Sequence, residues 1–444
     1  MFLKRINNFL NNSIVYRVTT SRELLKQHLQ TPLYRNAYYL IVSALVTAVL
    51  GFVFWVVAAR LYSPEDVGLA SATISAIILL ASFSTLGLGY GLIRFIPNAG
   101  PRSIPMINSS LTIAALVSIL VGSVFLVGLN FWSPALNFIL EQPLYIAVFL
   151  LFTLFWALFT ITDEVFISKR TSKYTLLKNI VANVTKIPLL YLPAIIVGTF
   201  TIITSAGLGM AVGTLIAMLW FLPKVLKGYL PIPTLRIGTL KAIIQYSLGN
   251  YVALLVWGLP AMIYPLLVVN VLGAEANAYF YIAWAIASMV FMIPHALSFS
   301  LFAEGSHNEE TLPSNIKKSL KLSIAILLPV ILVVCLIAST LLLFFGEGYS
   351  QNAEALVVVL VLSTIPLTVN YLYITANRVT KNIKRVISVS SVIALLCLCL
   401  SYFLMLELDI VGVGLGYVIG QSVVAIIVLI PLLRQRVKIN ETNK

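Results

Sequence analysis

Charged residues are scarce in this sequence. Only 10% of its 444 residues are charged, whereas 60% are hydrophobic, and a soluble globular domain carries about a quarter charged residues. A chain of this composition could not hide so much apolar side-chain surface from water. The scarcity of charge therefore excludes a water-soluble protein and predicts that lipid surrounds most of the chain.

Cysteine and the common catalytic motifs are also rare or absent. The three cysteines, Cys335, Cys397 and Cys399, all lie in apolar stretches. Two residues two positions apart on a helix point in different directions, so Cys397 and Cys399 do not form a metal site easily. The sequence has no Gly-x-x-x-x-Gly-Lys-Ser/Thr loop, no His-Glu-x-x-His and no paired-cysteine motif. We therefore expect no enzyme, no catalytic residue, no metal site and no cofactor.

Long apolar runs are what the sequence has in abundance. A helix needs roughly 20 apolar residues to cross the hydrocarbon layer. Twelve runs of about that length occur, at 38–59, 67–89, 107–129, 143–162, 176–197, 199–221, 243–271, 277–302, 320–345, 353–374, 386–406 and 410–433. The sequence predicts an all-α multi-pass membrane protein of about twelve transmembrane helices.

The basic residues predict how these helices are oriented. If the loops alternate between the two sides and the N-terminus is cytoplasmic, 27 of the 29 Lys and Arg residues fall on the cytoplasmic side, where such residues are enriched. The exceptions are Arg60, in an outer loop, and Lys186, within the fifth span. We therefore expect a protein of the cell membrane with both termini cytoplasmic. Basic clusters between apolar runs argue against a nucleic-acid partner, despite a net charge of +14.

The loops and the basic linker predict two halves. We expect a cytoplasmic segment at 1–35, a six-helix lobe at 36–222, a basic linker at 223–241, a second six-helix lobe at 242–433 and a cytoplasmic tail at 434–444. The first segment lacks the pattern of a cleavable signal peptide, and it fits an interfacial helix or a disordered tail equally well. Because six is even, both lobes begin on the same side, which predicts a parallel pseudo-repeat with a central cavity.

Several residues early in the chain resemble a known family. The segment Ala59-Arg-Leu-Tyr-Ser-Pro-Glu-Asp-Val-Gly68, followed by Leu86-Gly-Leu88 and Arg94, is similar to the opening of the polysaccharide-biosynthesis (O-antigen translocase) family. That family belongs to the multidrug/oligosaccharidyl-lipid/polysaccharide exporter superfamily. The resemblance implies a V-shaped pair of lobes, with the first, second, seventh and eighth helices lining the central cavity. It also implies flipping of polyprenyl-pyrophosphate-linked oligosaccharides to the outer leaflet.

One position departs from the family pattern. Related sequences often carry an acidic residue late in the seventh span, where this chain has Ile263-Tyr264-Pro265. The departure puts ion coupling through that position in doubt.

Lys186 is the clearest candidate for binding an anionic substrate. It lies near the middle of the fifth span, where a lipid-exposed lysine costs roughly 2.5–3.5 kcal/mol on insertion scales. Asn179 and Asn183 share its face of the helix. The stripe predicts a polar, substrate-binding surface; the alternative is a lysine whose head reaches an interface.

Six further residues are candidates for substrate binding. Arg35 and Arg94 flank the cytoplasmic mouth of the expected cavity, and Arg60 lies at its far mouth. An ordinary cytoplasmic anchor is the alternative for Arg35 and Arg94; it is the leading interpretation for Arg35, whereas the position of Arg94 in the family pattern favours a substrate contact. Asn250 and Trp257 lie along the seventh span, and His295 lies in the eighth. For His295, a buried neutral role is the leading interpretation and proton relay the alternative.

These observations favour a flippase for a lipid-linked oligosaccharide, acting by alternating access for cell-surface polysaccharide synthesis. A multidrug/cation antiporter is the alternative, but such proteins place acidic residues in a lobe, whereas Lys186 favours an anionic substrate. A glycan polymerase or glycosyltransferase would need a larger outer loop. The expected partners are the lipid-linked substrate, membrane lipid and polymerase or glycosyltransferase proteins, and we expect a monomer.

Overall fold

The computed structural model describes residues 32–191, 198–307 and 309–433, and every regular element in these ranges is a helix. Ten helical segments are long and apolar enough to cross a membrane. One of them, α16 (Ile383–Leu433), has non-helical backbone at Leu408 and Asp409 and so contains two of the predicted spans. Helix α8 (Lys173–Leu189) supplies another. Each of the twelve predicted spans therefore has a helical counterpart, and the all-α multi-pass prediction is confirmed.

The first six spans form the N-terminal lobe. Its long elements are α2 (Pro32–Leu61), α3 (Pro64–Ser84), α4 (Leu88–Phe95), α5 (Ser103–Val127), α7 (Pro143–Ser168), α8 and α9 (Thr199–Ile216). Shorter elements are α6 (Leu129–Trp132), α10 (Leu222–Val225), 3-10 turns at Ile96–Asn98, Gly100–Arg102 and Pro134–Leu140, and a π-helical stretch at Ala217–Phe221.

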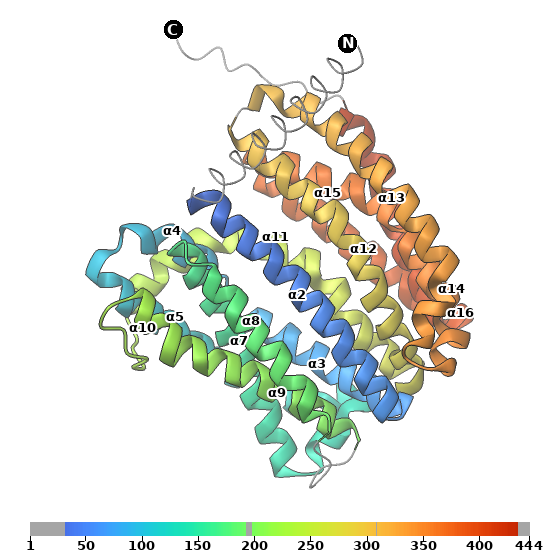
Figure 1. Ribbon diagram of the computed structural model, residues 1–444, viewed down its shortest axis with the longest axis horizontal. Coiled ribbons are helices and arrows are strands. Elements are labelled where there is room, and N and C mark those ends of the chain that lie inside the picture. The colour runs from blue at the N-terminus through green and yellow to red at the C-terminus, as the bar shows by residue number, and fades with distance from the viewer. Residues whose placement is uncertain (1–31, 192–197, 308, 434–444) are drawn as a thin grey trace, which may run out of the picture.

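The second six spans form the C-terminal lobe. They are α11 (Ile237–Val271), α12 (Ala274–His307), α13 (Leu312–Leu343), α14 (Glu347–Leu362) with α15 (Thr364–Val379), and α16, with a 3-10 turn at Glu309–Thr311. In Figure 1 the blue-to-green helices lie on one side and the yellow-to-red helices on the other, with α2 along the boundary in front. Most of the predicted cytoplasmic segment at 1–35 and the predicted tail at 434–444 lie outside the described residues, and residues 32–35 belong to the start of α2.

Local chemistry explains where the second span begins. The Ser63 hydroxyl accepts a hydrogen bond from the Asp66 amide, and Pro64 occupies the first turn of α3, which is a standard helix start. One Asp66 carboxylate oxygen also accepts bonds of 2.8 Å from the Thr199 amide and hydroxyl. This contact connects the start of α3 to the start of α9.

The second span is broken, which the prediction of a single helix over 67–89 missed. Helix α3 ends at Ser84 and α4 begins at Leu88, because Leu86 and Gly87 have φ angles of 49° and 69°. The left-handed backbone at Gly87 suits glycine. A Cβ there would also lie 2.5 Å from the Cβ of Tyr251 on α11, so the break lets the two lobes approach closely.

The linker between the lobes lies against α5. The Asn108 amide nitrogen donates to the Leu230 carbonyl at 2.8 Å, and the Thr234 and Arg236 amides donate to hydroxyls of α5. The buried phenol of Tyr229 has a pKa raised above its ordinary value by desolvation. Tyr229 therefore stays neutral and packs as an aromatic side chain.

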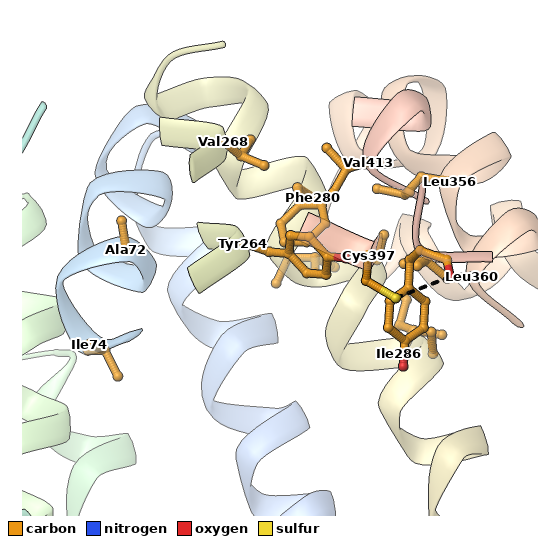
Figure 2. Close-up of a cluster of buried hydrophobic side chains, with 14 of the residues drawn as sticks. Ala72, Ile74, Tyr264, Val268, Phe280, Ile286, Leu356, Leu360, Cys397 and Val413 are labelled. Carbon is orange, nitrogen blue, oxygen red and sulfur yellow. Dashed lines mark hydrogen bonds between the residues drawn. The ribbon is translucent and has the colours of Figure 1, made fainter. Parts of the chain in front are cut away.

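The lobes meet mainly through one helix of the first lobe. Helix α3 packs against α11 and α12, and α4 packs against α11, whereas α2 packs mostly against α8. Figure 2 shows part of this core, with Ala72 and Ile74 on α3 to one side of Tyr264 and Phe280. Tyr264 is fully buried, and its hydroxyl accepts from Ser401 at 3.2 Å. The position late in the seventh span, where related sequences often carry an acidic residue, therefore holds the packed aromatic ring of Tyr264.

Candidate functional site: cavities at the inner half of the lobe junction

The helix connections gather at two ends of the molecule. We call the end with the start of α2, the α7–α8 turn and the end of α15 the inner end, and the end with the α2–α3 and α11–α12 turns the outer end. These names follow the orientation predicted from charge. The two ends differ in how the lobes meet.

At the outer end the lobes are joined by close backbone packing. The buried Asn277 side chain on α12 donates to the Gly68 carbonyl at 2.7 Å and to the Ser71 hydroxyl at 3.1 Å, both on α3. A Cβ on Gly68 would collide with the Ala274 carbonyl oxygen. Glycine is therefore required where α3 meets the first turn of α12.

Two further side chains bridge the lobes at this end. The Asn270 amide donates to the Ser133 hydroxyl at 2.9 Å, and its oxygen accepts from the Ala135 amide at 3.0 Å. The exposed Arg60 guanidinium donates to the carbonyls of Leu343 and Phe344 at the end of α13, a favourable position for a cation. Arg60 was predicted to meet substrate at the far mouth, whereas here it connects the two lobes.

At the inner half, helices α11, α12, α15 and α16 surround two adjoining pockets of about 140 and 330 Å³. Both pockets are lined by Trp257, His295 and Tyr371, and we call them together the C-lobe cavity. The larger of the two pockets adds Trp284, Tyr417 and polar Ser288 and Gln421. The cavity thus combines aromatic faces with a few polar groups, as small-molecule sites commonly do.

Arg378 lies at the inner mouth of the C-lobe cavity, in the last turn of α15. It is half-buried, and no carboxylate in the described ranges forms an ion pair with it. Tyr371 lies seven residues earlier on the same helix, about 10 Å deeper. The charge count assigned Arg378 to a loop, but the helix continues to Val379 and carries the guanidinium into the cavity.

A third pocket, of about 170 Å³, lies between the lobes and is lined by Thr85, Tyr90 and Glu164 from the first lobe and by Tyr251 and Leu254 from α11. We call it the junction pocket. Leu254 also lines the C-lobe cavity, so α11 separates the two spaces. The Tyr251 hydroxyl donates to the Ser82 carbonyl at 2.8 Å. The junction pocket is therefore bounded by a direct contact between the lobes.

A buried ion pair lies beside the junction pocket. The Lys178 ammonium lies 2.8 Å from the Asp163 carboxylate, and the lysine side chain is completely buried. Lys178 is one of the 27 basic residues that the charge count assigned to the cytoplasmic side, although it falls within the predicted span 176–197. That assignment is wrong, because α8 begins at Lys173 and packs Lys178 against α7. Asp163 and Glu164 lie in the last turns of α7.

The predicted polar stripe on α8 faces other helices of its own lobe. The Lys186 ammonium lies 4.6 Å from the centre of the Phe54 ring on α2. Asn179 donates to the Ser43 hydroxyl at 2.9 Å, and Asn183 to the Asn179 carbonyl at 2.8 Å. None of the three lines the cavities described above. Their role in substrate binding stays a prediction.

The remaining predicted residues divide into two groups. Trp257 and His295 line the C-lobe cavity together, whereas Arg35 and Arg94 are exposed at the inner end and Asn250 is half-buried on α11. His295 is exposed rather than buried, with its ring 5.6 Å from that of Tyr371. The buried interpretation of His295 is therefore wrong.

The fold is similar to several solved structures. An inward-facing multidrug resistance MATE family transporter of the MOP superfamily matches with a TM-score of 0.68 and 15% identity, over 87% of this chain and 93% of that chain. The lipid II flippase MurJ, in an inward closed conformation, matches with a TM-score of 0.72 and 12% identity, over 88% and 86%. A MOP superfamily transporter from Pyrococcus furiosus matches with a TM-score of 0.57 and 16% identity, over 91% and 94%.

These likenesses define the class: a multi-pass membrane protein with the two-lobed fold of the MOP transporters. No curated protein sequence matches the chain. The family model described as "Polysaccharide biosynthesis protein" matches residues 33–257, about half of the chain. The chain therefore belongs to the polysaccharide biosynthesis protein family, as its opening segment predicted.

Proposed function

We propose that this protein flips a polyprenyl-pyrophosphate-linked oligosaccharide from the cytoplasmic to the outer leaflet of the cell membrane. The observation that carries the proposal is Arg378, a guanidinium with no carboxylate partner among the described residues, at the mouth of an aromatic-lined cavity. Family membership and fold support it.

The chemistry of the cavity suits the two parts of such a substrate. A planar guanidinium can donate two parallel hydrogen bonds to a phosphate, so Arg378 suits a pyrophosphate. The rings of Trp257, Tyr371, Trp284 and Tyr417 lie deeper in the cavity and offer flat surfaces against which sugar rings can stack. In this arrangement the glycan enters first and the pyrophosphate stays near the mouth, next to the lipid.

The contrast between the two ends supports alternating access. The lobes are hydrogen-bonded to each other through Asn277 and Arg60 at the outer end and through Tyr251 at the inner half, where the cavities also lie. A cycle that loads from the cytoplasm would begin by opening the inner contact beside these cavities. Rocking of the lobes would then open the contacts made by Gly68 and Asn277. The proposal also includes three expectations from the sequence: polymerase or glycosyltransferase partners, a monomeric protein and cytoplasmic termini.

Deletion of the gene in its host tests the function. We expect lipid-linked oligosaccharide to accumulate on the cytoplasmic leaflet, and a copy carrying Arg378→Met to fail to restore export while Arg385→Met succeeds. Arg385 is exposed seven residues further along, at the start of α16, and serves as the matched control. Unchanged glycan export combined with increased drug sensitivity would instead support the multidrug antiporter.

A further inference from the structure

Two side-chain amides meet at the wall of the larger pocket of the C-lobe cavity. Gln421 on α16 lines this pocket, whereas Asn370 on α15 contacts Gln421 without lining the pocket itself. Both residues are buried, with exposed fractions of 2% and 0%. The Asn370 amide nitrogen lies 2.9 Å from the backbone carbonyl oxygen of Gln421 and 2.7 Å from its side-chain oxygen. Asn370 therefore holds Gln421 at two points.

These two contacts determine which way both amides face. A backbone carbonyl oxygen can only accept a hydrogen bond, so the Asn370 atom beside it must be the NH2 group, which carries two hydrogens. The same NH2 group can bond the end of the Gln421 side chain only through the oxygen of Gln421. Gln421 thus keeps its own NH2 group as a donor. The Tyr417 hydroxyl interacts with Gln421, and this contact can occupy at most one of the two hydrogens.

The surroundings of this donor are mostly apolar. Among the described residues, no carboxylate, lysine or arginine lines the larger pocket. The Ser288 hydroxyl donates to the Ala285 carbonyl at 2.7 Å, so its oxygen is left to accept a hydrogen bond. Trp284, Phe291 and Leu367 supply apolar surface. The pocket thus offers an amide donor, a hydroxyl acceptor and apolar walls.

An acetamido group on a sugar matches these features. Its carbonyl oxygen accepts a hydrogen bond, its N–H donates one, and its methyl group is apolar. A sugar hydroxyl has no methyl group, and a sugar carboxylate carries a charge that no lysine or arginine of this pocket would pair with. Arg378 lies eight residues after Asn370 on α15, about 12 Å along the helix. A substituent that contacts Gln421 therefore belongs to a sugar near the pyrophosphate.

We propose that Gln421 is a specificity-determining residue of the glycan site, which donates from its amide NH2 group to the carbonyl oxygen of an acetamido group on one of the first sugars. Asn370 is its positioning residue, because it binds the Gln421 oxygen and so leaves the NH2 group for the pocket. The proposal rests on the proposed function, since it requires a pyrophosphate-linked glycan in this cavity. A buried asparagine that does not touch the sugar thereby influences which sugar binds.

The test compares two ligands that differ at one position of the sugar. Farnesyl pyrophosphate linked to 2-acetamido-2-deoxyglucose and farnesyl pyrophosphate linked to glucose are titrated into the purified full-length protein in detergent, and calorimetry gives both affinities. One hydrogen bond between neutral groups changes an affinity by roughly 3- to 10-fold, so we expect the wild type to prefer the acetamido compound by about that factor. Gln421→Leu should bring the two affinities close together by weakening binding of the acetamido compound alone.

A second pair of variants tests the positioning role. Asn370→Leu should also lower the preference, because the Gln421 amide can then rotate. Asn377→Leu is the matched control: Asn377 is a buried asparagine on the same helix whose amide donates to the Tyr373 carbonyl at 2.8 Å, and this variant should keep the wild-type preference. The readout is the ratio of the two affinities, since a purely structural defect weakens binding of both ligands alike.

The proposal is overturned if the wild type binds the two compounds equally, or if Gln421→Leu keeps the wild-type preference; either result leaves the glycolipid site itself intact. Loss of the preference in Ser288→Ala but not in Gln421→Leu would assign the recognition to the serine. A wild-type preference in Asn370→Leu would remove Asn370 as the positioning residue. If neither compound binds the folded wild-type protein, the proposed function fails first and this inference fails with it.

Discussion

The outer end and the inner half of the lobe junction are built from different groups. At the outer end the contacts between α3 and α12 use glycine, a backbone carbonyl and the neutral amide of Asn277, with the guanidinium of Arg60 at the surface. The inner half contains Arg378 and Glu164 at cavities and the buried pair Asp163–Lys178 beside them. Separating neutral contacts of this kind costs little free energy, whereas an unpaired charge inside the protein is stabilised when it binds a ligand or a proton.

This difference indicates a division of roles. Each neutral outer hydrogen bond contributes only about 0.5–1.5 kcal/mol net, and hydrogen bonds to charged groups such as Arg60 contribute about 1.5–3 kcal/mol. The outer end is therefore held closed by several small contributions, which a ligand with different affinities for the two states can overcome. The inner charges are individually expensive to leave unpaired. We infer that the outer contacts form and break as the protein changes conformation, whereas the charged groups of the inner half determine which substrate binds.

The largest expected effect is on the buried ion pair of the inner half. Asp163→Asn leaves the buried Lys178 ammonium without its carboxylate, so we expect about 3–5 kcal/mol loss of stability. Thermal unfolding in detergent measures it. The double variant Asp163→Leu/Lys178→Met should recover most of this loss. A single variant as stable as the wild type would show that the pair does not stabilise the lobe.

The second-largest effect is expected at the outer end, from the contact between Gly68 on α3 and Ala274 on α12. Gly68→Ala places a methyl group against the Ala274 carbonyl, and overpacking of this kind costs about 1–3 kcal/mol. We expect the outer ends to separate, seen as a longer spin-label distance between cysteines placed at Glu65 and Glu354. Gly51→Ala is the matched control, because a Cβ there meets no atom within 4 Å. Equal distances in both variants would rule out Gly68 as a closing contact.

A smaller effect is expected from the amide that joins the same helices. Asn277→Ala removes the hydrogen bonds to Gly68 and Ser71. A loss of about 1 kcal/mol shifts the ratio of closed to open molecules roughly fivefold. The same spin-label pair should show an enlarged open population. A more closed population would contradict the assignment of Asn277 as a closing residue.

The smallest effect on transport is expected for Lys186. Its ammonium contacts the Phe54 ring within the first lobe, a contact that contributes about 0.5–2 kcal/mol. We therefore expect Lys186→Met to reduce export less than Arg378→Met in the complemented deletion strain, at matched protein levels. Equal loss of export in the two variants would restore Lys186 as a substrate-binding residue.

The sequence predicted the helices better than the site. Hydropathy locates apolar runs, and the alternation of basic loops fixes their number, so the twelve spans have their counterparts. The same reasoning ended the tenth span at residue 374, whereas α15 continues to Val379 and carries Arg378 to the cavity. It also counted Lys178 with the cytoplasmic loop charges, although this residue falls within the predicted span 176–197 and is buried on α8. Hydropathy averaged over a stretch of sequence cannot distinguish a charged residue in a loop from a charged residue in the last turn of a helix.

The aromatic lining of the C-lobe cavity could not be predicted for a different reason, whereas the break in the second span was overlooked. A tryptophan or tyrosine in a span can face lipid, a core or a cavity, and only the packing of neighbouring helices decides among these. Trp257 and His295 were among the predicted candidates, whereas Tyr371, Trp284 and Tyr417 of the same cavity were not. A signal for the break was present in the spacing of Gly87, Gly89 and Gly91, each of which faces a neighbouring helix closely.

In the proposed function, Arg378 binds the pyrophosphate of a lipid-linked glycan that this protein moves between leaflets. The most direct measurement is flipping of a fluorescent polyprenyl-pyrophosphate disaccharide in proteoliposomes, read by quenching from outside. Loss of a charged hydrogen bond, about 1.5–3 kcal/mol, predicts roughly 10- to 150-fold slower flipping by Arg378→Met at subsaturating substrate. Arg385→Met should flip like the wild type. Flipping by Arg378→Met at the wild-type rate would contradict the account.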